Sequence, residues 1–185
     1  MFISGLELRE ASFKRKHTIK DKTLEFSCMC LVGPGLFLLG STTPPRLTLY
    51  DTTEMKPAAH LDLQHDEEPG HVCLIPGEKV AVMCGWSNTI VIVSVKDNQL
   101  QREHAINIDS RFMCITSYKD VLFVVTGHVT ADRAYVSIVT LTGDRHVVCD
   151  LPEWWDRYSR MHDYLCLYSI TISKENEPKI YVTQQ

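Results

Sequence analysis

Three observations predict an all-β fold for this chain of 185 residues. Short apolar runs rich in β-branched residues alternate with turn residues along most of the sequence. The same pair of short strands around a tight turn recurs at intervals. No segment carries a sustained apolar period of about 3.6 residues, which disfavours a helical solenoid. Apolar residues make up 44% of the chain, which suffices to bury the core of one globular domain.

The clearest of these hairpins is KVAVMCGWSNTIVIVSV, residues 79–95. Residues 80–84 and 90–95 are predicted strands, and residues 85–88 supply the turn between them. Each strand is apolar on both faces, whereas a sheet with one solvated face alternates apolar and polar residues. We therefore expect this hairpin to be covered by other strands on both sides.

The strands fall into groups of four, and each element follows from its composition. In the first group Gly33-Pro34-Gly35 predicts a turn, and Pro44 and Pro45 predict a loop over residues 41–46. In the second group Pro76-Gly77-Glu78 is the first turn. The expected strands are 26–31, 36–39, 47–50 and 60–63 in the first group; 71–75, 79–84, 90–95 and 102–108 in the second; 112–116, 121–125, 135–141 and 145–149 in the third; and 166–172 and 179–183 in a final pair.

The repeat length identifies the architecture. Equivalent positions in the second strands, Leu36, Val80, Leu122 and Ile180, are 44, 42 and 58 residues apart, and an insertion at 151–164 accounts for the longest spacing. A period in the low forties with four short strands per repeat is typical of β-propeller blades. The fourth strands are the most polar, as expected where a blade meets solvent. A compact β-sandwich is the alternative fold.

The predicted fold is thus a single partial, open β-propeller. Its blades cover about residues 26–63, 71–108 and 112–149, followed by a half blade at 166–183 and preceded by an outer strand at 13–22. Propellers close with about 4–8 blades, and the lone outer strand would complete a last blade that this sequence lacks. We expect a fragment or short isoform of a longer propeller, whose open end blades favour self-association.

Charge and cysteine content indicate the setting. The net charge of −4, from 19 basic and 23 acidic residues, gives no general reason to bind nucleic acid or membrane. The seven cysteines lie mostly in apolar runs, which predicts free buried thiols in a reducing compartment. The N-terminus lacks the apolar core of a signal peptide, and no apolar stretch approaches the ~18 residues that span a bilayer. We expect a cytoplasmic protein.

Laid out blade by blade, the sequence resembles the C-terminal NHL-type propeller of invertebrate tripartite-motif (TRIM)-like proteins. In that family RING, B-box and coiled-coil segments precede the propeller and supply zinc binding, ubiquitin transfer and dimerisation. This chain has no Cys-x-x-Cys array and no heptad run. The resemblance therefore implies the partner-recruiting part of such a protein without ligase activity. It covers nearly the whole chain from about Ile19 and is carried by residues 36–52, 79–100, 112–127, 136–151 and 169–183.

No catalytic, metal or cofactor motif stands out. The chain has neither a Gly-x-Ser-x-Gly elbow nor a Gly-rich phosphate loop. Cys28 and Cys30 share one face of a strand, but without a second cysteine pair they are predicted to pack in the core. A propeller enzyme such as a lactonase or lyase needs converging carboxylates around a metal. The connection over residues 60–71 is rich in histidines and acidic residues, but they lack the fixed spacing of metal ligands, so we interpret it as a solvated loop. The residues concerned are His60, Asp62, His65, Asp66, Glu67, Glu68 and His71.

The insertion PEWWDRYSRMHDY, residues 152–164, is the predicted contact surface for a protein partner. Trp, Tyr and Arg are the residue types enriched at interaction hot spots, and loops of this length are often functional. The alternative is that the two tryptophans fold back and cap the propeller. The candidate contact residues are Trp154, Trp155, Arg157, Tyr158 and Arg160.

The alternative function is RNA binding, which some NHL propellers perform through a basic face. The basic run Lys14, Arg15 and Lys16 lies in the predicted outer strand and would contact phosphates. Lysines also guard solvated edge strands, and that interpretation is favoured here. The sequence thus predicts a non-catalytic protein-interaction module without metal or cofactor.

Overall fold

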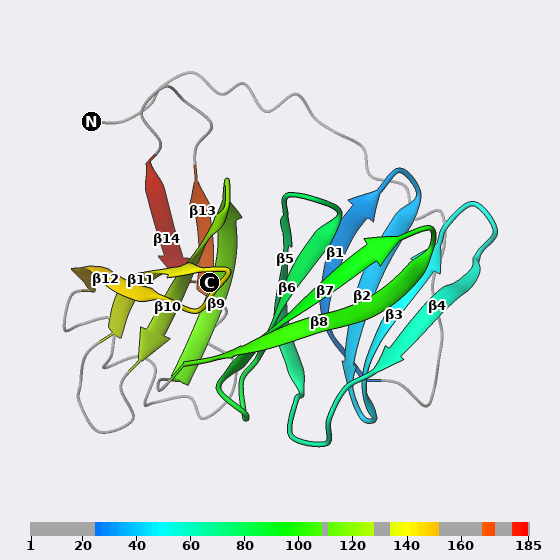
Figure 1. Ribbon diagram of the computed structural model, residues 1–185, viewed down its shortest axis with the longest axis horizontal. Coiled ribbons are helices and arrows are strands. Elements are labelled where there is room, and N and C mark those ends of the chain that lie inside the picture. Colours follow the sequence, from blue (N-terminus) through cyan, green and yellow to red (C-terminus); the bar gives the residue numbers. More distant parts are fainter. Residues whose placement is uncertain (1–24, 109–110, 128–133, 152–167, 173–178, 185) are drawn as a thin grey trace.

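The computed structural model describes residues 25–108, 111–127, 134–151, 168–172 and 179–184. The described part consists of strands and turns. Three four-stranded sheets and one two-stranded sheet form, and in each the strands pair antiparallel in chain order (Figure 1). This confirms the predicted all-β, open partial propeller with three full blades and a half blade. The predicted outer strand at 13–22 lies outside the described residues.

Each sheet is one blade. Blade 1 contains β1 (Phe26–Gly33), β2 (Leu36–Thr42), β3 (Pro45–Asp51) and β4 (Lys56–Asp62); blade 2 contains β5 (Pro69–Ile75), β6 (Lys79–Cys84), β7 (Thr89–Lys96) and β8 (Gln99–Asn107); blade 3 contains β9 (Arg111–Tyr118), β10 (Val121–Gly127), β11 (Ala134–Thr140) and β12 (Arg145–Asp150); and the half blade contains β13 (Tyr168–Ile172) and β14 (Ile180–Gln184).

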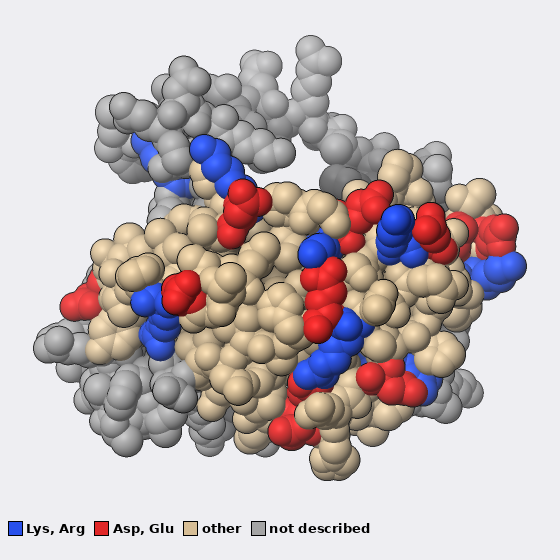
Figure 2. All heavy atoms as spheres, in the orientation of Figure 1, with Lys and Arg blue, Asp and Glu red and all other residues tan. Residues whose placement is uncertain are grey.

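The first strands of successive blades lie next to one another. β1 contacts β5, β5 contacts β9, and β9 contacts β13. The fourth strands β4, β8 and β12 are the most exposed, as the polar sequences predicted. On the face shown in Figure 2, acidic and basic side chains of the described residues are interspersed, so no patch of one sign forms there.

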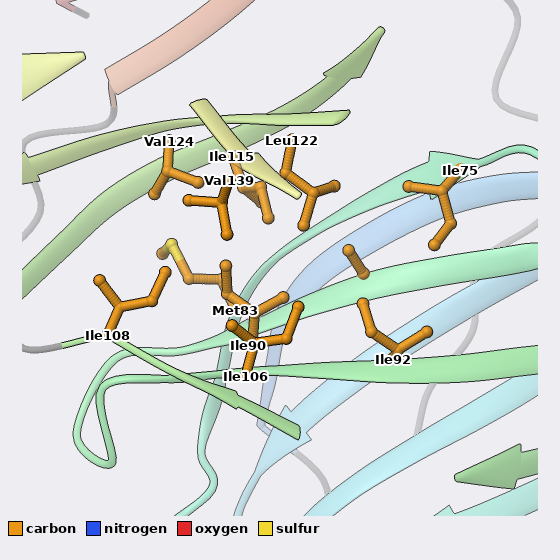
Figure 3. Close-up of a cluster of buried hydrophobic side chains, with 11 residues drawn as sticks. Ile75, Met83, Ile90, Ile92, Ile106, Ile108, Ile115, Leu122, Val124 and Val139 are labelled. Atoms are coloured by element: carbon orange, nitrogen blue, oxygen red, sulfur yellow. The ribbon is translucent and has the colours of Figure 1, made fainter. Parts of the chain in front are cut away.

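The hairpin β6–β7 is covered on both sides, as its doubly apolar sequence predicted. On one side Val80, Val82, Val91 and Val93 pack against Leu38 and Leu47 of blade 1 in one buried cluster. On the other side the isoleucines of β7 pack against blade 3, and the facing side chains point toward one another (Figure 3). That second cluster contains Ile75, Ala81, Met83, Ile90, Ile92, Ile106, Ile108, Ile115, Leu122, Val124 and Val139.

The equivalence assigned to Leu36 was wrong by one residue. The first residue of the second strand pairs across the turn with the last paired residue of the first strand. In blade 1 this pair is Leu36 with Gly33, and in blade 3 it is Val121 with Tyr118. Leu36 therefore corresponds to Val121 and not to Leu122. In line with this, Leu38 faces the following blade, as Ala81 of the next blade does. Residues 36–39 are all apolar, so apolarity alone could not fix which face each one takes, and a shift of one residue exchanges the faces.

The loop predicted over residues 41–46 is also wrong. β2 continues to Thr42 and β3 starts at Pro45, which pairs with Thr42 across a tight turn. Pro45 is tolerated because a proline at the first residue of a strand removes no essential ladder hydrogen bond. The hydroxyl of Ser41 donates to the carbonyl of Pro44 at 2.9 Å, which fixes the turn.

The connection between blades 1 and 2 contains a buried ion pair where a solvated loop was expected. Glu67 is only 2% exposed and accepts a hydrogen bond from Arg102 Nη2 of β8 at 2.7 Å on Oε1. Arg102 Nη1 reaches the second carboxylate oxygen, which also accepts the Gln64 backbone N–H at 3.1 Å. These hydrogen bonds hold the pKa of Glu67 below its usual value. The pair ties the connection to the outer strand of blade 2.

Shortening a buried side chain of the β6–β7 hairpin should destabilise the fold strongly. Ile92 is 1% exposed in the cluster between blades 2 and 3, so Ile92→Ala is expected to cost about 2–5 kcal/mol of unfolding free energy. The measurement is urea unfolding. Val147, which is 56% exposed on β12, is the control, and Val147→Ala should change stability by less than about 0.5 kcal/mol. Equal effects of both changes would contradict the two-sided burial.

The Glu67–Arg102 pair should make stability depend on pH. Because the pKa of Glu67 is lowered on folding, its contribution is complete above the unfolded value of about 4.3 and is lost as pH falls through the folded value. Glu67→Gln is expected to cost about 1–3 kcal/mol near neutral pH and less near pH 3, because the contribution of the carboxylate declines below the unfolded pKa. Urea unfolding at both pH values measures this, with Glu68→Gln, in the same connection, as the control. A pH-independent loss in Glu67→Gln would argue against the ion pair.

Candidate functional site

The residues predicted to contact a partner lie outside the described residues. This applies to the protein-contact set Trp154, Trp155, Arg157, Tyr158 and Arg160, and to the basic set Lys14, Arg15 and Lys16. Both assignments stay predictions. The described part of the chain offers three other surfaces, one at each end of the blades and one on β1.

The two ends are defined by the turns that they carry. Within each full blade the turns after the first and third strands lie at one end, here called the first end. The turn after the second strand and the connections between blades lie at the opposite, second end. The interior of the described blades is mainly apolar, so binding surfaces are expected at these ends or on the outer strands.

A groove of about 500 Å³ opens at the first end between blades 1 and 2. Three tight turns surround it: Pro34-Gly35, residues 76–78, and Asp97-Asn98. The turns are conformationally defined, because Gly35, Glu78, Asp97 and Asn98 all adopt positive φ values between 51° and 74°. The pairing of Lys96 with Gln99 across Asp97-Asn98 is a two-residue hairpin, a geometry that favours such residues.

The groove has apolar walls and a polar rim. Its walls include Val32, Leu36, Leu74 and Val95, and Leu74 is 43% exposed although it lies on an inner strand. Val32 and Val95 also pack against the cluster between blades 1 and 2, so the groove is the open end of that interface. Pockets of this volume with mostly apolar walls and a few polar groups are typical ligand sites.

The charges at the rim are mainly acidic. Glu78 and Asp97 line the groove, and no salt bridge joins either to another described residue. Lys79 also lines it, but Lys79 Nζ lies 2.7 Å from Glu103 Oε2, which compensates its charge. Lys96, next to Asp97 in sequence, is exposed and does not line the groove. The rim therefore favours a positively charged group.

At the second end, the turn between β6 and β7 presents Trp86. The indole side chain is 74% exposed, although the strands on either side of the turn are buried. The turn is held by several hydrogen bonds. The Ser87 hydroxyl lies 2.6 Å from the Thr89 hydroxyl, and the backbone N–H of Ile108 donates to the Asn88 carbonyl at 2.9 Å. Trp86 is therefore exposed on a fixed platform.

Next to Trp86, the side-chain oxygen of Asn88 is buried and accepts no hydrogen bond from the described residues. Asn88 has φ 52°, a conformation that Asn tolerates better than most residues. The large exposed ring of Trp86 suits contact with another protein, because Trp is enriched at interaction hot spots.

A third surface lies on β1. Met29 and Leu31 are 65% and 53% exposed, and a hollow of about 340 Å³ beside them is lined by Phe26, Met29 and Leu39. Neighbouring Cys28 and Cys30 alternate with these residues along the strand. This surface is where the predicted association of end blades would occur, and that association stays a prediction.

The cysteines of the described part are free thiols. Burial raises the pKa of Cys73, Cys84 and Cys114 to about 12, and that of Cys28 to about 11. Such groups are protonated at neutral pH and react slowly as nucleophiles or metal ligands. Cys28 packs beside Gly40, where an added methyl group would lie 2.5 Å from its sulfur. Cys84 and Cys114 are buried core side chains, Cys28, Cys30 and Cys73 are partly buried, and Cys149 is exposed.

Among the described residues, no three His, Cys, Asp or Glu side chains gather as a metal site. Within the connection rich in His and acidic residues, Glu67 pairs with Arg102 instead. In the same described ranges, no helix is long and apolar enough to cross a membrane.

Sequence reasoning missed both Trp86 and the groove. Trp86 lies within a stretch interpreted only as a turn, although a tryptophan between two fully apolar strands has no room inside the blade and must point outward. The groove could not be found, because its walls and the three turns around it come from segments distant in sequence.

No family model and no curated protein matches the sequence. Solved structures match the fold at low sequence identity. The β-propeller domain of Cps50 (Swd1) from Myceliophteria thermophila is 12% identical, with a TM-score of 0.59 over 85% of this chain and 47% of that one. A virginiamycin B lyase from Staphylococcus aureus, solved with quinupristin, is 15% identical, with a TM-score of 0.56 over 74% and 45%.

A third similar structure, the glutaminyl cyclase of Myxococcus xanthus, is 12% identical, with a TM-score of 0.52 over 70% of this chain and 51% of that one. The chain thus spans about half the length of these structures. Because their activities differ, the likeness does not identify an activity. The described strands form part of a β-propeller.

Proposed function

We propose that this chain is a non-catalytic protein-interaction module, the partner-recruiting part of a TRIM-like protein with an NHL-type propeller. The observation that carries the proposal is Trp86, held 74% exposed by a hydrogen-bonded turn between buried strands. A turn whose backbone is already ordered adds little ordering cost on binding, and an indole has only two side-chain torsions to order, so much of the contact energy appears as affinity.

The surroundings of Trp86 support a protein partner. The turn lies at the second end together with the connections between blades, which can supply further contacts. The Asn88 side-chain oxygen is buried within the turn, so the contact with a partner would be made by the exposed indole and by the connections around it.

The chemistry of the described residues agrees with a binding role. Its buried thiols have raised pKa values, so they are poor nucleophiles, and free cysteines suit a reducing compartment such as the cytoplasm. The interspersed charges on the face in Figure 2 lack the one-sign patch that phosphate binding favours. The insertion at 152–164 is proposed as a second contact region for the same partner.

Trp86→Ala should weaken partner binding by more than about tenfold, because the variant loses a hot-spot side chain. Partners captured from cell extract by the wild-type chain are first identified and purified. Their affinities are then measured by calorimetry with the wild-type chain, with Trp86→Ala and with Val147→Ala, which removes an exposed apolar side chain from the outer strand of blade 3.

Unfolding free energies of these variants should match the wild type within about 0.5 kcal/mol, since both side chains are exposed. Unchanged affinity in Trp86→Ala would remove the main support for the proposal. Capture that disappears after nuclease treatment and falls steeply with salt would favour RNA binding instead.

A further inference from the structure

We infer that the groove at the first end, between blades 1 and 2, binds a short peptide segment of a partner protein that carries an apolar anchor residue next to a Lys or Arg. This site lies at the opposite end of β6–β7 from Trp86, and the inference does not depend on the proposed role of that residue.

The shape is preformed. Three tight turns with defined backbone conformations enclose the groove, and the backbone N–H of Val95 donates to the Glu78 carbonyl at 2.7 Å, joining the turn at residues 76–78 to β7. A site that does not have to order itself on binding retains more of its contact energy as affinity. A volume of about 500 Å³ accommodates a few side chains of a peptide and not a folded domain.

The apolar walls of the groove are where the apolar anchor residue of the peptide would bind. Leu74 is 43% exposed, whereas the other residues of β5 are buried or partly buried. Val32, Leu36 and Val95 line the same groove. Filling the groove with an aliphatic or aromatic side chain would remove this surface from water and extend the apolar cluster between blades 1 and 2. The anchor would thus continue an interface that the fold already contains.

Charge selects the neighbouring residue of the peptide. Glu78 and Asp97 both line the groove without a salt bridge to another described residue, whereas Lys79 is paired with Glu103 at 2.7 Å. An approaching Lys or Arg would meet two carboxylates at the rim, while an acidic residue would be repelled. The rim therefore specifies a basic residue, and the walls specify an apolar one.

The experiment is selection of short peptides from a random hexapeptide library on the immobilised chain. The expected result is enrichment of peptides with one apolar residue flanked by Lys or Arg. Affinities of enriched peptides, measured by fluorescence anisotropy, should fall about threefold to tenfold in the double variant Glu78→Gln and Asp97→Asn, and this difference should shrink at high salt. Both changes keep side-chain size, and Asn suits the positive φ at residue 97.

Three further variants separate the outcomes. Leu74→Asp should abolish peptide binding while its unfolding transition, measured in urea, stays cooperative. Asp120→Asn, which neutralises an exposed turn carboxylate at the same end of blade 3, should leave the affinity unchanged. Trp86→Ala should also leave it unchanged, so failure here and failure of the Trp86 proposal are distinguishable. Selection of no peptide, of peptides without basic residues, or of peptides indifferent to the double variant would overturn the inference.

Discussion

The two-sided burial of the β6–β7 hairpin is the constraint on which the described fold depends. Its valines face blade 1 and its isoleucines face blade 3, and both sets are almost wholly excluded from water. Because neither face is free, each neighbouring blade must present a complementary apolar face of its own. The repeated face-to-face arrangement of the sheets follows from this requirement. It also leaves the turns and the outer strands as the surfaces on which recognition can occur.

The repeat and its interior could be predicted from the sequence, because they depend on local composition. Apolar runs of fixed length, turn residues between them and polar fourth strands gave the blades directly. The assignment of faces in blade 1 failed because residues 36–39 are uniformly apolar, so only the pairing at the turn, between Gly33 and Leu36, determines which side chains point to blade 2. Face assignment is a property of register, and register is set by turn geometry as well as by hydrophobic pattern.

The polar contacts and the candidate sites could not be predicted in the same way, because they join residues far apart in the chain. Glu67 and Arg102 are separated by 35 positions, and nothing in the sequence around Glu67 distinguishes it from the solvated acids beside it. The groove requires turns from two blades to meet. Trp86 did carry a local signal: a large ring in a four-residue turn between buried strands has no space inside the blade.

The groove and the Trp86 turn adjoin the same hairpin, β6–β7, which bears on how they would act together. Trp86 lies in the turn at one end of β6–β7, and Glu78 and Asp97 lie in turns that flank the same strands at the other end. Since the hairpin between them is packed on both faces, neither surface can shift without disturbing two apolar clusters. Ligands at the two ends should therefore bind with nearly additive free energies, because coupling requires an element with two accessible arrangements. A chain built in this way is suited to hold two binding partners in a fixed relative orientation.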